Sequence, residues 1–168
     1  MRRFLRWTLV VLAGIAIAIV GLILEGGMLE QVFAIGDVPV IDFATLQRAP
    51  TPNQYLLCPA DLCTTQTDGA APVFDLPADR LQATWEQLMA EQPRVELLRR
   101  DLADVQIDYV QRTRLLRFPD LVTVRFIPVD DTHSTLAIYS RSVYGKGDMG
   151  VNHARVEGWL AQLKALVG

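Results

Sequence analysis

The chain has 168 residues, of which 51% are hydrophobic, and its mean hydropathy of +0.22 is high for a soluble domain. This length suits one domain of ordinary size and is short for two. The formal net charge is −3 and no run of basic residues is longer than two, a distribution that argues against nucleic acid as a partner.

The apolar excess lies near the N-terminus, where the 17 residues Thr8–Leu24 carry no charge. As a helix this run spans about 25 Å, and Phe4–Trp7 can complete a crossing of the ~30 Å hydrocarbon core. We therefore expect residues 1–25 to form a transmembrane anchor. A cleaved signal peptide is the alternative. Its apolar region is shorter, about 7–15 residues, and the small-residue match "VFA" at 32–34 is late.

Charges at the two ends of this run predict its orientation. Arg2, Arg3 and Arg6 precede the run, whereas Glu25 and Glu30 follow it. Because positive charge is retained on the cytoplasmic side, the N-terminus is expected in the cytoplasm and the remainder in the periplasm. The expected protein is a single-pass protein of the inner (cytoplasmic) membrane.

Residues 26–52 are expected to be a tether, because glycine and proline interrupt the segment repeatedly. The tether contains one apolar island, "VPVIDFATL", at residues 38–46. Apolar side chains at this density need a surface to cover. The domain, the lipid headgroup boundary and a partner protein are the three surfaces that the sequence leaves open.

Two amphipathic helices are predicted within the domain of residues 53–168. The first has a capping-box pattern at Asp79 and Gln82 and ends before Pro93. Its apolar stripe is Leu81, Trp85, Leu88 and Met89. The second covers about residues 152–166, and its stripe is Val156, Trp159, Leu160, Leu163 and Leu166.

Between the helices lie runs with a period of two, at about residues 94–100, 104–116, 121–129 and 135–144. Short turns separate these runs, so neighbouring strands are expected to be antiparallel. We predict a two-layer α+β domain, in which two helices pack on one face of an antiparallel sheet of four or five strands. The other face is expected to face water. Its charged residues are Asp108, Arg112, Arg114 and Arg125.

The stretch "YGKGDMGVN", residues 144–152, contains the glycine spacing of a dinucleotide-binding loop. That site requires a parallel strand–helix–strand unit and an acidic residue about 20 positions later, and neither is predicted here. A tight turn is the simplest interpretation: Gly145, Gly147 and Gly150 permit it, and Asp148 or Asn152 caps the helix.

An anion site at the start of the last helix is the other interpretation of this loop. Helix N–H groups favour a carboxylate, phosphate or lipid headgroup. Basic or polar residues nearby are Arg141, Lys146, Asn152 and Arg155. Asp148 opposes this interpretation, because its charge repels an anion.

Cys58 and Cys63 are the two cysteines, and in an exported protein they are expected to form a disulfide. A metal site would need further ligands, but His133 and His153 do not have ligand spacing. No metal, cofactor or catalytic residue is therefore predicted. Neither a Ser–His–Asp nor a Cys–His arrangement is apparent, and Asp130–Asp131 are expected in a solvated turn.

Several motifs resemble the domain-of-unknown-function family 1499 (DUF1499), over about residues 42–166. The most specific residues, which we call the signature residues, are Ser140, Arg141, Ser142, Gly145, Asp148, Gly150, Asn152 and Arg155. "DFATL", "PNQYLLCPADLC" and "LRFPD" also match. Tyr139 and Val143 depart from the basic residues expected at these places. The resemblance implies the domain limits and an envelope setting, and it brings no established activity.

The sequence as a whole predicts a membrane-anchored, non-catalytic periplasmic module. We expect it to dock on other envelope proteins as an accessory subunit or assembly factor. The alternative is a small anionic or lipidic ligand bound between the sheet and the C-terminal helix. A cavity lined by Trp159 and Leu163 would favour the ligand, and solid packing there would favour the partner protein. An enzyme lacks a plausible base.

Overall fold

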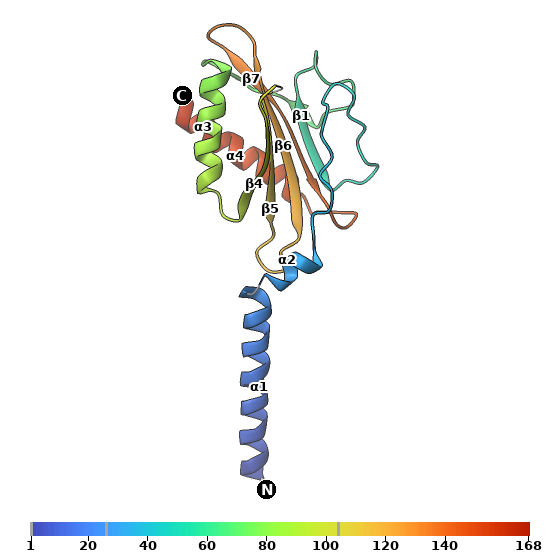
Figure 1. Ribbon diagram of the computed structural model, residues 1–168, viewed down its shortest axis with the longest axis vertical. Helices are drawn as coiled ribbons and strands as arrows, with labels where there is room; N and C mark the ends of the chain where they lie inside the picture. Colours follow the sequence, from blue (N-terminus) through green and yellow to red (C-terminus); the bar gives the residue numbers. More distant parts are fainter. Residues whose placement is uncertain (1, 26, 104) are drawn as a thin grey trace.

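A curved β-sheet forms the centre of the domain, with helices on one face, irregular chain on the other, and one helix extending away (Figure 1). The computed structural model describes residues 2–25, 27–103 and 105–168, and within the first helix it describes the side chains of Trp7 and residues 9–21. The helices are α1 (Arg2–Glu25), α2 (Met28–Val32), α3 (Ala78–Glu91) and α4 (Val151–Val167). The strands are β1 (Gln54–Cys58), β2 (Gly69–Ala70), β3 (Val73–Phe74), β4 (Val95–Asp101), β5 (Gln106–Arg112), β6 (Pro119–Pro128) and β7 (Ser134–Ser142).

The sheet is mixed and has seven strands, in the order β2-β1-β7-β6-β5-β4, with β3 paired to β7. The four strands β4 to β7 are antiparallel neighbours, as the alternating sequence predicts. β1 pairs antiparallel with β7, whereas β2 pairs parallel with β1. The prediction of four or five strands, all antiparallel, is therefore wrong. β2 and β3 have two residues each, too few to show any periodicity in the sequence.

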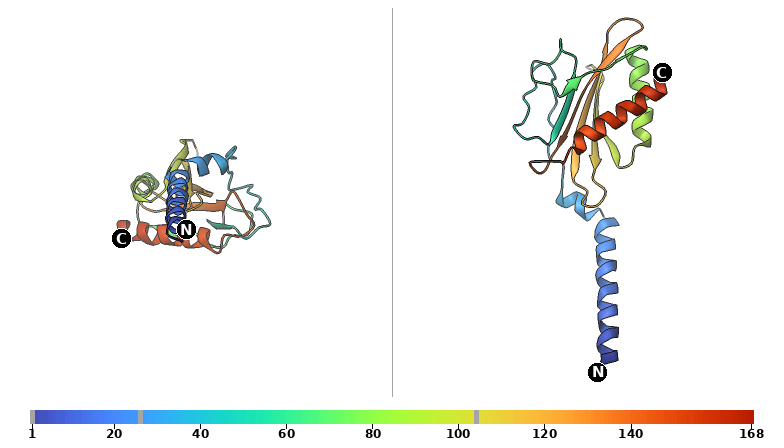
Figure 2. Two further views of the ribbon diagram at one scale, coloured as in Figure 1. Left: turned by 90° about the horizontal axis from the view of Figure 1, so that it is seen from below. Right: turned by 180° about the vertical axis from the view of Figure 1, so that it is seen from behind.

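The helices α3 and α4 pack their apolar stripes on one face of the sheet (Figure 2). On α3 all four predicted stripe residues are buried, and on α4 all except Leu166, which is 60% exposed. Trp85 meets Trp159 edge-on, with ring centroids 5.9 Å apart, and Phe126 at 6.3 Å. Trp159 and Leu163 are 3% and 0% exposed, so side chains fill the space beneath α4. The predicted two helices on one face are confirmed.

The start of α3 differs from the predicted capping box. The N-cap residue is Pro77, which has no side-chain acceptor for the first helical N–H groups. Asp79 lies in the first turn, where its charge complements the helix dipole. Gln82 donates to Glu86 at 2.8 Å instead of reaching back to the cap. The capping-box prediction is wrong because the helix begins one residue before the expected N-cap.

Irregular chain covers the second face of the sheet. Phe43 and Leu46, from the apolar island, are 0% and 8% exposed. They pack in a second core cluster with Leu56, Cys58, Ala137 and Tyr139. Of the three surfaces that the sequence left open for the island, these two side chains cover the domain itself. Val40 stays 66% exposed.

The expectation that this second face meets water is wrong for its central charges. The side chains of Asp108 and Arg112 are only 4% and 7% exposed. Backbone carbonyls of the covering chain accept hydrogen bonds from two buried polar side chains of this face. Arg112 donates to the carbonyl of Phe33 at 3.2 Å, and Gln106 donates to that of Ile41 at 3.0 Å. An extended segment can bury a polar face in this way, since its own carbonyls are otherwise unpaired.

The helix α1 has 24 residues and extends away from the end of the domain near α2 (Figure 1). Large apolar side chains described between Trp7 and Val20 are 51–73% exposed. Among the residues that the structure describes, we find no helix long and apolar enough to span a membrane. The side chains of Arg2, Arg3, Arg6 and Glu25, on which the predicted orientation depends, lie outside the described side chains.

Cys58 and Cys63 form the predicted disulfide, which closes the loop after β1. The two residues are five positions apart, so the bond restricts a short loop in the unfolded chain. We expect the double variant Cys58→Ser, Cys63→Ser to lose roughly 2 kcal/mol of unfolding free energy. Urea unfolding followed by tryptophan fluorescence measures this loss. A loss much above that value would show that the disulfide also organises the buried cluster around Cys58.

The β6–β7 turn holds His133 against Asp130. The Asp130 carboxylate accepts the backbone N–H of Thr132 at 2.7 Å and that of His133 at 2.8 Å. These bonds and the contact with His133 Nδ1 lower the pKa of Asp130. The hydrogen bond and charge of Asp130 raise the pKa of His133.

We expect Asp130→Asn to bring the pKa of His133 down toward about 6.5, the ordinary value. Since the folded-state pKa is raised, the contribution of His133 to stability is present below pH ~6.5 and is lost as pH rises through the raised pKa. An NMR titration of the His133 ring in both proteins measures the shift. Equal pKa values in the two proteins would contradict this assignment.

Candidate functional site

The glycine loop joins β7 to α4 at the end of the domain next to α2 (Figure 1). Gly145 and Gly150 have φ angles of 86° and 80°, in the left-handed region that glycine adopts without steric cost. Gly150 is also the N-cap residue of α4. The chain needs these glycines in order to turn from a strand directly into a helix.

Asp148 occupies the position where an anion would bind at the start of α4. Its carboxylate accepts the backbone N–H of Gly150 at 3.0 Å and that of Asn152 at 2.8 Å. Burial alone would raise the pKa of Asp148, but these hydrogen bonds outweigh burial and hold the pKa below its ordinary value. β7 is antiparallel to both β1 and β6, so the loop also lacks the parallel strands of a dinucleotide site.

Asn152 connects the loop to the sheet and is fully buried. Its amide donates to the carbonyl of Asn53 at 3.0 Å and to Ser142 Oγ at 3.1 Å. Its side-chain oxygen accepts from Ser140 Oγ at 2.6 Å. Asn53 in turn donates to the carbonyl of Gly145 at 2.9 Å. These bonds fix the loop to the ends of β1 and β7.

Arg155 completes this buried network one turn further along α4. Its guanidinium bonds to Asp120 and Gln111, each at 2.5 Å, and to Ser140 Oγ at 2.9 Å. The side chains of Arg155 and Asp120 are 6% and 5% exposed, which makes this a buried ion pair. Asn152 Oδ1 accepts a further bond at 2.6 Å. The N–H donors of Arg155 already have hydrogen-bond partners within the protein, so this residue has a structural role.

Arg141 lies on the opposite face of the sheet from Asn152 and Arg155. Successive side chains of a strand point to opposite faces of the sheet. Ser140 and Ser142 point toward Asn152, so the side chain of Arg141 points to the other face. Its guanidinium stacks 4.9 Å from the ring of Tyr139 and donates to Thr123 Oγ1 at 3.2 Å. Burial lowers its pKa.

The structure therefore joins only two of the four residues expected to hold an anion. Asn152 and Arg155 contact each other, but Arg141 is on the other face of the sheet. Lys146 is exposed in the loop and forms no ion pair with any described residue. The proximity of the four in the sequence was misleading, because strand alternation separates Arg141 from the rest.

A pocket of about 380 Å³ lies beside the glycine loop. Its lining residues are Thr113, Phe118, Asp120, Ser142, Tyr144, Gly145, Gly147, Asp148, Met149 and Val151. Its two carboxylates are already bound, Asp120 to Arg155 and Asp148 to the start of α4. Basic residues are missing from this described lining, so the pocket does not suit an anion. It suits an apolar group.

The sequence matches the family described as "Protein of unknown function (DUF1499)" over residues 47–163. The chain belongs to this family. The comparison with curated proteins gives no match. The DUF1499 match includes the signature residues. Apart from Arg141, which lies on the opposite face of the sheet, they build the buried network, the glycine loop and the pocket wall. It begins after Phe43, although that side chain is buried in the domain.

Three aromatic rings connect the DUF1499 pocket to the chain that follows α2. Phe33 lies 4.4 Å from Phe118 and 5.6 Å from Tyr144, measured between ring centroids. The hydroxyl of Tyr144 donates to the carbonyl of Ala34 at 2.6 Å. In addition, Arg117 forms an ion pair with Glu30 of α2. α2 is thus held against this end of the DUF1499 domain.

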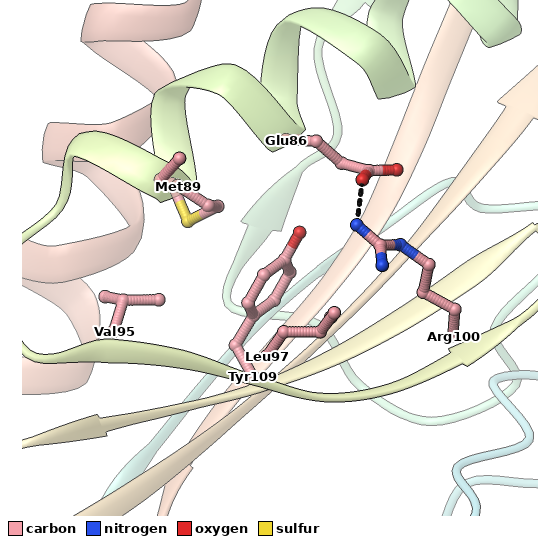
Figure 3. Close-up of a pocket in the computed structure, with 7 residues that line it drawn as sticks. Glu86, Met89, Val95, Leu97, Arg100 and Tyr109 are labelled. Carbon is pink, nitrogen blue, oxygen red and sulfur yellow. Dashed lines mark hydrogen bonds and ion pairs between the residues drawn. The ribbon is translucent and has the colours of Figure 1, made fainter.

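A smaller pocket of about 140 Å³ lies between α3 and the strands β4 and β5 (Figure 3). Glu86 and Arg100 form an ion pair, which lies to the side of the Tyr109 hydroxyl in this view. Burial would raise the pKa of Glu86, but bonds from Arg100 and Gln82 outweigh it and keep the pKa low. Burial raises the pKa of Tyr109, so its phenol stays neutral. Neither group is a base with a pKa near neutrality.

A third hollow, of about 450 Å³, lies beside the disulfide loop. Its lining residues are Pro59, Asp61, Leu62, Ala71, Val73, Ile127, Pro128, Val129 and Thr135. Asp61 is the single titratable residue in this described lining. The hollow therefore offers no acid–base pair either.

Sequence reasoning missed the partners of the signature residues. Asn53, Gln111 and Asp120 lie far from the glycine loop in the sequence, and strand pairing brings them to it. Phe118 and Asp120 belong to the "LRFPD" motif, which the family resemblance did identify. The apolar pocket had one further sequence signal, the apolar residue Met149 within an otherwise polar, glycine-rich loop.

Proposed function

We propose that the chain is a membrane-anchored, non-catalytic interaction module whose DUF1499 domain faces the periplasm. It docks on other envelope proteins, as an accessory subunit or assembly factor of a membrane complex. The observation that carries this proposal is the apolar pocket at the α2 end of the domain, next to the point where α1 joins. A pocket at this place is available to a partner that lies close to the membrane.

The proposed anchor rests on the sequence and on the exposure of α1. The run Thr8–Leu24 is uncharged, and the apolar side chains described from Trp7 to Val20 have no packed core around them. An exposed apolar surface of this extent needs an apolar environment. Three arginines before the run support a cytoplasmic N-terminus, and the Cys58–Cys63 disulfide is compatible with an oxidising compartment.

The non-catalytic role is supported by the state of the polar groups at the site. Arg155, Asn152 and Asp148 use their side-chain atoms in internal bonds, and the pocket wall has no histidine or cysteine among its described residues. A nucleophile next to a general base is the usual requirement for acyl or phosphoryl transfer. The pocket supplies shape and apolar surface instead.

A site-specific photocrosslinking experiment tests docking. A photoreactive amino acid replaces Met149 at the pocket, or Val129 at the opposite end as a matched exposed control. The intact chain is crosslinked in cells and purified in mild detergent, and the products are identified by mass spectrometry. We expect an envelope protein crosslinked from position 149 and absent from position 129. Identical products from both positions, or a C-terminal reporter found in the cytosol, would contradict the proposal.

A lipidic ligand in the same pocket is a second candidate, and the apolar lining of Phe118, Tyr144 and Met149 favours it. Gly147 also lines the pocket, and a side chain added there meets nothing within 4 Å. Gly147→Trp is therefore expected to fill the pocket, whereas Gly158→Trp adds the same bulk on the exposed side of α4. Native mass spectrometry should show a bound lipid that only Gly147→Trp removes. Loss in both variants would contradict this candidate.

A further inference from the structure

Exposed apolar side chains gather at the α2 end of the DUF1499 domain. We call them the α2-end patch: Met28, Val32, Leu115, Leu116 and Met149, each at least half exposed. They come from three segments, namely α2, the β5–β6 turn and the glycine loop. Apolar residues scattered singly on a surface need no explanation, but a group on one end of a domain usually marks an interaction surface.

Tertiary contacts hold the three segments of the patch together. The Arg117–Glu30 ion pair ties the β5–β6 turn to α2. Phe33, just after α2, lies against Phe118, and Tyr144 of the glycine loop bonds to Ala34. The three segments that carry the patch therefore lie together at the end of the folded domain from which α1 extends (Figure 2).

Charges of both signs lie beside the patch: the Asp148 carboxylate, next to Met149, is bonded to the start of α4, and two basic side chains lie nearby. Arg114 precedes Leu115, and Lys146 lies in the glycine loop; both are exposed and neither forms an ion pair with a described residue. Glu30 is already neutralised by Arg117. Apolar side chains interleaved with free basic groups are typical of protein surfaces that bind the interface of an anionic bilayer.

We propose that the α2-end patch inserts into the interfacial region of an anionic lipid bilayer, so that the DUF1499 domain rests on the membrane. This inference rests on the proposed function, because α1 is what brings the patch to the bilayer. α1 ends at Glu25 and α2 begins at Met28. Two residues separate them, and the three Cα–Cα steps from Glu25 to Met28 span about 11 Å at most, so the patch cannot lie far from the end of the apolar run.

Insertion of the α2-end patch would also place the pocket close to the membrane. Met149 belongs to both the patch and the pocket lining, and Tyr144 lines the same pocket. With the patch inserted, the pocket lies at the depth of the lipid headgroups, where it can meet a partner's membrane-proximal segment or an acyl chain.

The test uses the full-length chain, with its disulfide intact, in nanodiscs of phosphatidylcholine and phosphatidylglycerol. An environment-sensitive fluorophore is attached at Met149→Cys, and at Val129→Cys as the control on the opposite end. We expect the fluorophore at 149 to shift to the blue and to be quenched by spin-labelled lipids, at a depth on the order of 5–10 Å below the headgroup boundary. The fluorophore at 129 should show neither effect.

A second variant tests whether the patch acts as a unit. Leu115→Asp with Leu116→Asp is expected to return the fluorophore at 149 to the emission of position 129, while thermal unfolding is unchanged because both leucines are exposed. The proposal is overturned if position 149 remains as solvated as position 129, or if the double variant leaves quenching unchanged. A fluorophore at 149 that is shielded from water only when two chains share a nanodisc, and that the spin-labelled lipids do not quench, would assign the patch to contact with a second copy of the chain. That result would also overturn the proposal.

A separate measurement distinguishes failure of the proposed α1 anchor from failure of the proposed patch insertion. Retention of the unlabelled chain in vesicles after an alkaline carbonate wash reports on α1 alone. If the chain resists the wash but the fluorophore at 149 is solvated, the result supports the proposed anchor and contradicts insertion of the patch. A chain that the wash releases contradicts the anchor itself.

Discussion

Replacing Arg155 with alanine is expected to lower the unfolding free energy of the DUF1499 domain by about 3–5 kcal/mol. The guanidinium satisfies Asp120, Gln111 and Ser140 in a site that is almost closed to water. Its removal leaves the Asp120 carboxylate buried and unpaired. Desolvation of a charge without a partner outweighs the modest net gain that the ion pair gives to the intact protein.

Urea unfolding of the purified chain, followed by tryptophan fluorescence, measures this loss, since Trp85 and Trp159 both lie in the core. Arg114→Ala is the matched control, because Arg114 is exposed, and we expect it to change stability by less than about 0.5 kcal/mol. The paired variant Arg155→Leu, Asp120→Leu should recover a large part of the loss, as no lone charge remains. A similar loss in the paired variant would show that packing, not charge, dominates here.

The helical layer was predictable because its signal is local. The stripes of α3 and α4 repeat at helical spacing within single segments, and the buried residues match them. The four-strand core from β4 to β7 was predictable for the same reason, since each strand alternates and short turns join them. Neither inference required knowledge of a distant partner.

The site was only partly predictable, because its parts come from distant segments. The sequence placed Asn152 and Arg155 on the last helix, but Asp120 and Gln111 reach them through strand pairing. Arg141 was misplaced because the Ser-Arg-Ser run was treated as one group. Strand alternation puts its central residue on the opposite face.

The irregular chain that covers the second face of the sheet, which we call the coil layer, was the least predictable part of the fold. The chain around Phe33, Ile41 and Phe43 has no periodicity, and its position depends on bonds to side chains far along the sequence. Proline and glycine indicated an irregular segment correctly, but composition does not say which surface such a segment covers. The buried polar side chains of β5 are the groups that bond to the carbonyls of this segment. They could be interpreted only after the covering chain was seen.

Phe43→Ala is expected to cost about 3–5 kcal/mol of unfolding free energy. The ring is 0% exposed in the cluster with Leu56 and Tyr139, so truncation leaves a cavity between the coil layer and the sheet. Val40→Ala, in the same segment but 66% exposed, is the control and should change stability by less than about 0.5 kcal/mol. Chemical denaturation of the three proteins measures the difference.

The outcome for Phe43 also decides whether α1 is held in a fixed position relative to the domain. If Phe43→Ala and Val40→Ala lose equally little, the segment is a tether that touches the sheet without stabilising it, and α1 could move independently of the domain. A large, selective loss makes the segment part of the folding unit, although the family match begins only at residue 47. The bonds from Arg112 to Phe33 and from Arg117 to Glu30 then connect α2 rigidly to the sheet. The position of the pocket relative to α1 would then follow from the fold itself.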